Sequence, residues 1–164
     1  MATISLCMIV KNEESVLGRC LDCVKGIADE IIIVDTGSSD RTKEIAAAYT
    51  DKIYDFQWND DFSAARNDAF SKASMEYTMW LDADDVIPEE EQNKIRKLKK
   101  ELTPDISAVM MKYVTAFDDS GKPAFLFDRE RLLRREKGYR FSGRVHEAVE
   151  LSGAKILYLS LIHI

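Results

Sequence analysis

A buried strand that ends in carboxylates stands at residues 77–85, where the sequence reads Y-T-M-W-L-D-A-D-D. Its apolar part, Tyr77 to Leu81, is typical of a strand covered on both faces in a parallel sheet. Ligands bind outside the carboxyl ends of such strands, and the two-residue period of an extended chain turns Asp82 and Asp84 to the same side. We therefore expect a parallel sheet with a ligand site at the end of this strand.

The segments before this strand alternate between strand-like and helix-like patterns. That alternation is typical of an α/β fold, a mostly parallel, doubly wound sheet with helices on both faces. Strands are predicted at Ile4 to Val10, Glu30 to Val34 and Lys52 to Phe56. Helices are predicted from an Asn12 cap to about Val24, from about Asp40 to Tyr49, and from Asp60 or Asp61, the last with Phe62, Ala65, Ala69 and Phe70 on its packed side.

The segments after the strand change in character. Pro88 opens a solvated helix with three glutamates at its start and lysines near its end, which suits the helix dipole. From Ala108 onward a long strand, a turn at residues 119–121 and a second strand at Phe125 to Leu133 predict an antiparallel hairpin. The run from Ile156 to Ile164 is apolar to its final residue, and we expect a truncated chain or an atypical tail there.

Size and charge exclude several classes of protein. With 164 residues, of which 46% are hydrophobic and 32% charged, the chain has the balance of one folded domain. The net charge of −6 argues against nucleic acid and anionic membrane surfaces as partners. No apolar run reaches the roughly 20 residues that span a bilayer, and the first ten residues lack the features of a signal peptide. We therefore expect a cytoplasmic protein with no integral membrane segment.

The carboxylates that follow residue 81 suit a divalent cation. Mg²⁺ prefers oxygen ligands and commonly uses one or two carboxylates together with substrate phosphate oxygens, and Mn²⁺ serves equally well. Asp82 and Asp84 would then hold Mn²⁺ or Mg²⁺ against a diphosphate. The alternative is that the aspartates only cap the turn and the helix near Pro88, and Asp85 is the one that we assign to capping.

Other polar groups fall at predicted strand ends, where the same crevice should lie. Residues 11–14 follow the first strand, residues 35–40 follow the second, and Arg66 lies on the helix before the carboxylate strand. Each group could instead be an ordinary helix cap or a solvated face. For Arg66 the structural alternative is a salt bridge to Asp60 or Asp61.

Four motifs in this order resemble the family 2 glycosyltransferases, which have the GT-A fold. They are V-K-N-E-E at 10–14, I-V-D-T-G-S-S-D at 33–40, F-S-A-A-R-N-D-A at 62–69 and W-L-D-A-D-D at 80–85, and the later R-x-x-R and G-R-V-H-E extend the resemblance toward residue 150. The combination is most similar to the cytosolic, non-processive branch with sublancin-type peptide and protein S- or O-glycosyltransferases, often followed by helical repeats. It implies hexosyl transfer from a nucleotide-sugar donor, with a UDP-sugar expected.

The resemblance also implies a domain division and a set of site residues. One catalytic domain would cover residues 1–164, with a nucleotide-sugar part in 1–103 and a hairpin and acceptor-side part in 104–164. Glu13 and Asp35 would contact uracil or ribose, and Asp84 would bind the metal that bridges the diphosphate. Arg66 would neutralise the donor, and Asn67 would orient neighbouring loops. The whole nucleotide-sugar set is Val10, Asn12, Glu13, Asp35, Arg66, Asn67 and Asp82.

Family 2 members invert the anomeric centre in one displacement, which implies a carboxylate base for the acceptor proton. In the segment 143–147 we assign that role to Glu147, although this chain has His-Glu where the wider family has an acid pair. His146 could be a further metal ligand, a phosphate contact or a packed side chain. The sequence does not identify the acceptor, which could be a peptide, a protein, a lipid or a glycan.

Three other readings compete with a transferase. Residues 35–38 also spell the aspartic protease signature, although the helix predicted after them does not suit that β-rich fold. Residues 82–86 match the nucleophile loop of haloacid-dehalogenase-type phosphatases, in which the first Asp is the nucleophile. A non-catalytic or truncated nucleotide-sugar-binding module is the third alternative.

Overall fold

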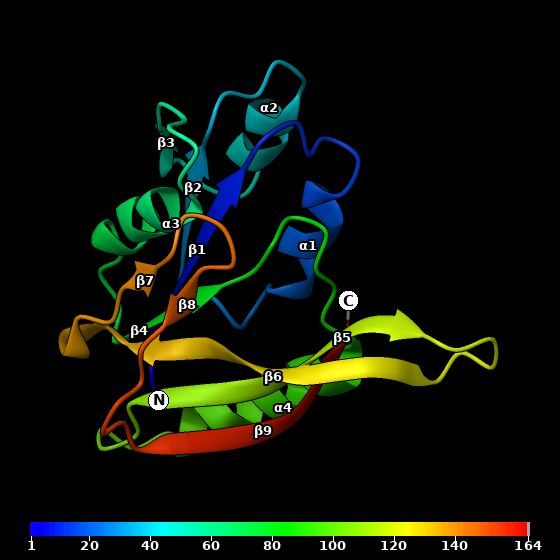
Figure 1. Ribbon diagram of the computed structural model, residues 1–164, viewed down its shortest axis with the longest axis vertical. Coiled ribbons are helices and arrows are strands. Elements are labelled where there is room, and N and C mark those ends of the chain that lie inside the picture. The colour runs from blue at the N-terminus through cyan, green and yellow to red at the C-terminus, as the bar shows by residue number, and fades with distance from the viewer. Residues whose placement is uncertain (164) are drawn as a thin grey trace.

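The computed structural model describes residues 1–163, with side chains through Leu159. Its main feature is a seven-stranded sheet in the order β3-β2-β1-β4-β6-β5-β9, beside a two-stranded sheet of β7 and β8 (Figure 1). The elements are β1 Ile4–Val10, α1 Leu17–Cys23, β2 Glu30–Asp35, α2 Thr42–Ala47, β3 Ile53–Asp55, α3 Phe62–Ser71, β4 Tyr77–Trp80, α4 Glu89–Glu101, β5 Ala108–Phe117, β6 Pro123–Arg134, a 3₁₀ turn at Arg135–Lys137, β7 Phe141–Ser142, β8 Ala148–Val149 and β9 Ile156–His163. The expected α/β, mostly parallel sheet is confirmed.

Side chains along β1 alternate between the two faces of the sheet, which explains why helices cover both faces. Ile4, Leu6 and Met8 point to one face, where they join a core with α1, α2 and α4. Cys7 points to the other face and packs with Ala69 of α3. Strands buried on both faces become nearly continuous apolar runs, which is how β1, β2 and β4 read in the sequence.

The C-terminal strands complete the same sheet. The order of pairing places β6 antiparallel between β4 and β5, and β9 pairs parallel with β5. The predicted hairpin is therefore confirmed, and its tip protrudes beyond the body of the molecule (Figure 1). The ladder of β5 and β6 shifts register between Val109 and Met110, whose partners are Leu132 and Glu130, so Arg131 falls at a β-bulge.

The segment from Ile156 is a strand rather than an irregular tail. Residues 156–163 form β9 at the edge of the sheet, and Leu157 and Leu159 pack against the main core. Ile164 lies outside the described residues, as do the side chains of residues 160–163. An alternating apolar run next to a hairpin can extend its sheet, which the expectation of an atypical tail overlooked.

Two predicted helices differ from the observed ones, the first at its start and the second in its exposure to solvent. Asn12 does not cap α1: its backbone has a left-handed φ of 55°, and its Oδ1 accepts a hydrogen bond from the Ser39 N–H at 2.8 Å. A turn closed on the Glu13 carbonyl comes first, and the helix begins at Leu17. The helix after Pro88 is not exposed to solvent on every side, because Lys99 is buried and its Nζ donates a hydrogen bond to the Ile27 carbonyl.

Glu30 is a buried carboxylate at the start of β2. Burial would raise its pKa, but hydrogen bonds from Lys52, Ser5 and Ser74 outweigh that effect and lower the pKa to about 2. A carboxylate whose pKa is lower in the folded than in the unfolded state stabilises the fold above its unfolded pKa. That stability is lost as the pH falls toward 2.

We expect Glu30→Gln to destabilise the protein by on the order of 2 to 3 kcal/mol at pH 7, because the change removes an ion that the fold binds preferentially. The difference from the wild type should shrink between pH 5 and pH 3, as measured by denaturant unfolding at each pH. Glu44→Gln is the control, since Glu44 forms only an exposed ion pair with Arg41. A difference that does not change with pH would contradict this account of Glu30.

Candidate active site

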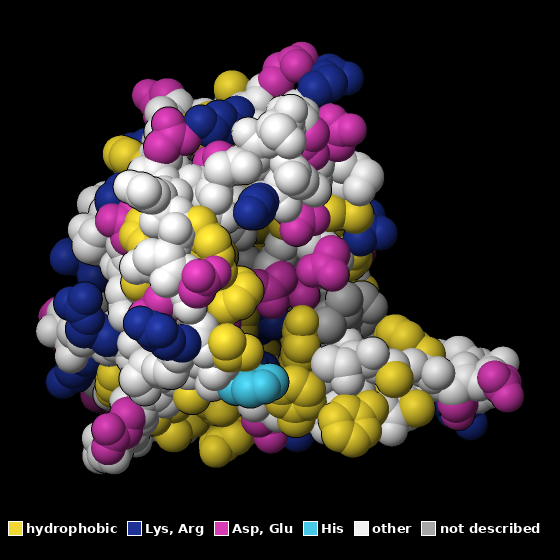
Figure 2. Space-filling model, turned by 45° about the horizontal axis from the view of Figure 1, so that its top comes forward, with side chains coloured by type: hydrophobic (Ala, Val, Ile, Leu, Met, Phe, Trp, Pro, Cys, Tyr) yellow, Lys and Arg dark blue, Asp and Glu magenta, His cyan; other side chains and the backbone are white. Residues whose placement is uncertain are grey.

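A cleft of about 420 Å³ opens at the carboxyl ends of β1 and β4, beside the start of α3. The molecular face in Figure 2 is hollowed at its centre, where acidic side chains gather beside apolar ones. Several predicted site residues line this cleft: Val10, Glu13, Arg66, Asp82 and Asp84. With Thr36, which also lines the cleft, the fold brings together side chains from all four sequence motifs.

A tight turn after β4 holds the two aspartates that were predicted to bind metal. The Asp82 N–H donates to Asp85 Oδ2 at 2.9 Å, and the Asp85 N–H donates to the Asp82 carbonyl at 3.1 Å. Asp85 therefore caps the turn, as expected. It does not cap the helix near Pro88, because α4 has no side-chain cap. Instead Arg131 Nη1 lies 3.1 Å from Asp85 Oδ2.

Burial dominates the electrostatics of this turn. The side chains of Asp85 and Arg131 are at most 1% exposed, and Arg131 Nη1 also donates to the Trp80 carbonyl at 3.1 Å. Burial raises the pKa of Asp85, and Arg131 offsets the rise only in part. The Asp82–Asp85 turn thus depends on a cation supplied by β6, from the C-terminal part of the chain.

The acidic side chains in the cleft repel one another. The pKa of Glu13 is raised, by burial first and then by the charges of Asp84, Asp40 and Asp82. Within the part of the chain that the structure describes, no three His, Cys, Asp or Glu side chains converge on one point as metal ligands. Two carboxylates with phosphate oxygens are a common environment for Mg²⁺, so exposed Asp84 and half-buried Asp82 fit a cation that arrives with a diphosphate.

Arg66 joins two carboxylates of the site. Its Nη2 lies 2.7 Å from Asp82 Oδ1, and its Nε lies 2.7 Å from Glu147 Oε1. The guanidinium stacks 4.5 Å from the centre of the Trp80 ring. The proposed structural alternative, a salt bridge to Asp60 or Asp61, is wrong: Arg66 points away from the helix start and into the cleft.

Glu147 belongs to a loop that α3 holds in place. Ser63 Oγ donates to the Gly143 carbonyl at 2.5 Å, and the Phe62 N–H donates to the Arg144 carbonyl at 3.1 Å. His146 has a left-handed φ of 61° and an exposed side chain, and it does not line the cleft. The Glu147 carboxylate therefore pairs with Arg66, which lines the cleft, whereas neither Glu147 nor His146 lines the cleft itself.

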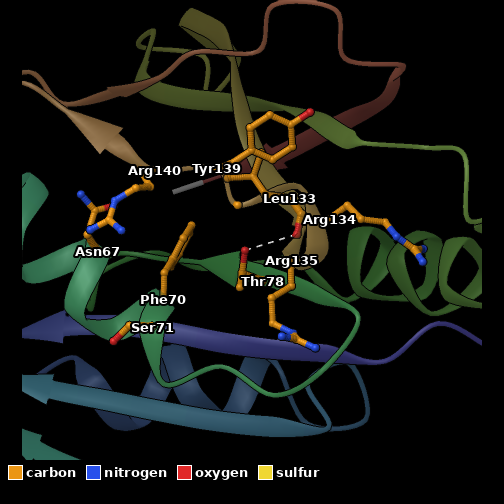
Figure 3. A pocket seen from close by; sticks show the side chains of 10 residues that line it. Asn67, Phe70, Ser71, Thr78, Leu133, Arg134, Arg135, Tyr139 and Arg140 are labelled. Carbon is orange, nitrogen blue, oxygen red and sulfur yellow. Dashed lines mark hydrogen bonds between the residues drawn. The ribbon is translucent and has the colours of Figure 1, made fainter.

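Asn67 does not line the cleft and instead forms two hydrogen bonds with Phe141, which precedes the loop that carries Glu147. Its amide donates to the Phe141 carbonyl at 2.9 Å and accepts from the Phe141 N–H at 2.8 Å. Asn67 also lines a second cavity of about 150 Å³ (Figure 3). That cavity lies between α3 and residues 134–140, and both Phe70 and Tyr139 line it.

Asp35 and Asn12 shape the rim without lining the cleft. Asp35 Oδ2 accepts hydrogen bonds from the Gly37 N–H at 3.0 Å and the Ser38 N–H at 2.9 Å. Asp35 Oδ1 is buried and has no hydrogen-bond partner among the residues that the structure describes. Such an oxygen is costly to leave unpaired, and a ligand donor could satisfy it.

Two aromatic residues that were not predicted as part of the site, Trp58 and Phe62, form one wall of the cleft. Trp58 and Phe62 meet edge to face, with ring centres 4.9 Å apart, and Phe62 is 39% exposed. Phe62 was expected on the packed side of its helix, but at the first helical position it projects over the cleft instead. Ile9, Lys11, Thr36 and Ala83 complete the lining. The signal that could have revealed the wall was a pair of aromatics around Asp60-Asp61.

The family of the chain is shown by a match that covers most of its length. A model of the family described as glycosyl transferase family 2 matches residues 5–157. The chain belongs to this family. This match decides against the phosphatase and the aspartic protease, since the Asp35 and Asp82 motifs both lie within it.

Curated relatives of this family 2 chain agree with the match. A TPR repeat-containing protein of Synechococcus elongatus is 37% identical over 92% of this chain and 36% of its own length. The SPbeta prophage-derived glycosyltransferase SunS of Bacillus subtilis is 32% identical over 88% of this chain and 34% of its own length. The chain thus spans about a third of the length of these relatives.

Solved structures share the fold. TarS 1-349 of S. aureus aligns with 89% of this family 2 chain and 52% of its own, with a TM-score of 0.63 and 19% identity. Glucosyl-3-phosphoglycerate synthase of M. tuberculosis, in complex with Mn²⁺, UDP and glucosyl-3-phosphoglycerate, aligns with 68% and 44% of the two chains, with a TM-score of 0.55 and 21% identity. The expected GT-A-like fold is confirmed.

We expect Asp85→Ala to destabilise the protein by about 3 to 5 kcal/mol, because it leaves the charge of Arg131 buried and unpaired. The neighbouring Asp84→Ala should change stability by no more than about 0.5 kcal/mol, since that side chain is exposed. Denaturant unfolding of both variants measures the difference. Equal effects of the two substitutions would show that the Asp85–Arg131 pair does not hold the turn.

Proposed function

We propose that the chain is the catalytic part of a metal-dependent, inverting glycosyltransferase that uses a nucleotide-sugar donor, with UDP as the nucleotide. One observation carries the proposal: carboxylates from two distant segments, Asp82 after β4 and Glu147 between β7 and β8, meet on a single guanidinium beside an acidic cleft. A single displacement needs a carboxylate that acts as the base, here Glu147, next to the donor-site carboxylate, here Asp82.

The choice of nucleotide and metal is supported by two relatives in fold. One TarS structure contains UDP, and the M. tuberculosis synthase was solved with Mn²⁺ and UDP-glucose. Those ligands belong to those proteins, and we carry them to this chain as part of the proposal. The carboxylates of the cleft suit Mn²⁺ or Mg²⁺, which would stabilise the charge that develops on a departing diphosphate.

Different residues of the cleft would bind the diphosphate and the nucleoside of the donor. Asp84 and Asp82 would face the cation and the diphosphate, and Lys11, which also lines the cleft, would lie on the same side as a counter-charge. Glu13 and the unpaired Asp35 Oδ1 would accept hydrogen bonds from the uracil or the ribose. Val10 and Asn12 would support this end of the site. His146 as a metal ligand stays a prediction.

The transfer step requires one base. Glu147 takes the proton of the acceptor hydroxyl or thiol while the acceptor oxygen or sulfur attacks the anomeric carbon. The bond between that carbon and the diphosphate oxygen breaks, its electron pair leaves with the nucleotide diphosphate, and the configuration of the sugar inverts. Asp82 and Arg66 keep Glu147 beside the donor during this step.

The acceptor is not identified by these observations, and a cytoplasmic location remains part of the proposal. Among residues 1–163, no helix has the length and apolar character needed to cross a membrane. Phe125 and Phe127 are exposed on β6, and by the two-residue period of the strand they lie on the same face as Arg129. Acceptor choice would depend on such surfaces, which lie outside the donor cleft.

We expect Asp84→Asn to weaken Mn²⁺-dependent UDP binding by about 30-fold or more, because it removes a ligand of the cation. Glu147→Gln should leave UDP binding within a few-fold of the wild type and lower turnover by about 100-fold. Calorimetry with UDP and Mn²⁺ measures binding, and release of UDP from a panel of UDP-sugars measures turnover.

Each outcome of these measurements decides between different possibilities for the site. Equal losses of UDP binding in both variants would refute the division of roles between Asp84 and Glu147. A wild-type chain that binds UDP with Mn²⁺ but releases none from any donor would favour a binding module without catalysis. Lys137→Gln is the control, since Lys137 is exposed and does not line the cleft.

A further inference from the structure

We propose that Arg66 is a positioning residue for the base: its contact with Glu147 places that carboxylate at the donor site, and its contact with Asp82 ties the base to the donor carboxylates. This inference rests on the proposed function and changes the role of Arg66. The sequence motif implied a ligand of the donor diphosphate, whereas the contacts of the side chain point to Glu147.

The Arg66 guanidinium already forms ion pairs with two carboxylates. Two of its three nitrogens lie 2.7 Å from carboxylate oxygens, Nη2 from Asp82 and Nε from Glu147. The third, Nη1, is buried and has no partner among the described residues. The side chain is only 7% exposed. A donor phosphate would therefore have to displace a carboxylate to reach Arg66 in the bidentate manner that such ligands favour.

The charges of the cluster lead to the same conclusion. One guanidinium charge stands against two carboxylates, so Arg66, Asp82 and Glu147 together carry a net negative charge. Burial disfavours the charged guanidinium, but the two carboxylates outweigh that effect and raise the pKa of Arg66. A cluster of this sign attracts a cation and offers little to a phosphate without one.

The backbone around Glu147 is fixed separately from its side chain. Ser63, Phe62 and Asn67 hold the loop through carbonyl and amide groups of residues 141–144, and all three belong to α3. Arg66 lies on the same helix and is the described partner of the Glu147 carboxylate. One helix thus presents both the loop and the cation that orients its carboxylate.

The stacking of the Arg66 guanidinium on aromatic rings limits which type of residue can position Glu147. Its guanidinium lies 4.5 Å from the Trp80 ring centre and 5.6 Å from the Phe141 ring centre, which fixes the plane of the fork. A lysine carries a point charge without a fork and cannot hold two carboxylates in a set geometry. Arg66→Lys keeps the charge and should lose the alignment.

The first test separates turnover from binding. For Arg66→Lys we expect kcat for UDP release from the best UDP-sugar of a panel to fall by about 10- to 100-fold, with Kd for UDP and Mn²⁺ within about three-fold of the wild type. The matched control is Arg140→Lys, an exposed arginine of the second cavity, which should change neither value. A Kd that rises ten-fold or more with kcat preserved would overturn the inference, because it would make Arg66 a donor ligand.

The second test is a double-mutant cycle with Arg66→Gln, Glu147→Gln and their combination. If Arg66 acts through Glu147, the double variant should lose no more than about three-fold beyond Glu147→Gln alone. The double variant also leaves no charge of this pair unpaired, so it keeps the test valid if Arg66→Gln unfolds. Losses that multiply would show that Arg66 acts independently of the base.

These outcomes also distinguish the inference from the proposed function. If the wild-type chain releases no UDP from any donor, the proposed function fails and the positioning role fails with it. If the wild type releases UDP but the losses multiply, or if Arg66→Lys loses UDP binding instead of turnover, the proposed function stands and the positioning role alone is refuted.

Discussion

Two buried arginines hold the carboxylates at the end of β4, and the rest of the site depends on them. Arg131 pairs with Asp85 beneath the turn, and Arg66 pairs with Asp82 above it. The Trp80 ring lies between them, 4.1 Å from the Arg131 guanidinium and 4.5 Å from that of Arg66. Without these cations, a turn with three aspartates in four residues would repel itself in a partly dry environment.

The two arginines come from different parts of the chain. Arg66 is on α3, which covers the parallel strands, whereas Arg131 falls at a bulge in β6 of the antiparallel hairpin. Because β6 inserts next to β4, the division at residue 103 that the family resemblance suggested does not coincide with a break in the sheet. Asp82, Asp85 and the two arginines that pair with them therefore form one unit across both parts.

The charge distribution explains why a cation and a diphosphate suit this site together. The cleft contains more carboxylates than cations, and the raised pKa of Glu13 records that repulsion. A metal ion relieves the repulsion, and a diphosphate supplies its remaining ligands. An anionic ligand by itself would meet carboxylates, so the balance of charge supports the proposal that the site takes a nucleotide together with a metal ion.

Sequence patterns by themselves determined the parallel sheet, the hairpin and the position of Asp82 and Asp84 after the end of β4. These features depend on local periodicity and on the rule that ligands lie at the carboxyl ends of parallel strands. The resemblance in four motifs identified the family, which the match over residues 5–157 then showed. Helix starts were less well predicted, because Asn12 bonds to a loop 27 residues away rather than to the next turn.

Only the tertiary structure decided which charges pair. The sequence offered Arg66 as a donor ligand or, alternatively, as a partner of Asp60 or Asp61, but its partners are Asp82 and Glu147, the latter 81 residues away. Asp85 was expected to cap a local helix, but it neutralises Arg131 from β6. Sequence periodicity specifies which face of an element is buried, whereas an ion pair depends on which elements become neighbours in the sheet. That arrangement is set by packing across the whole fold.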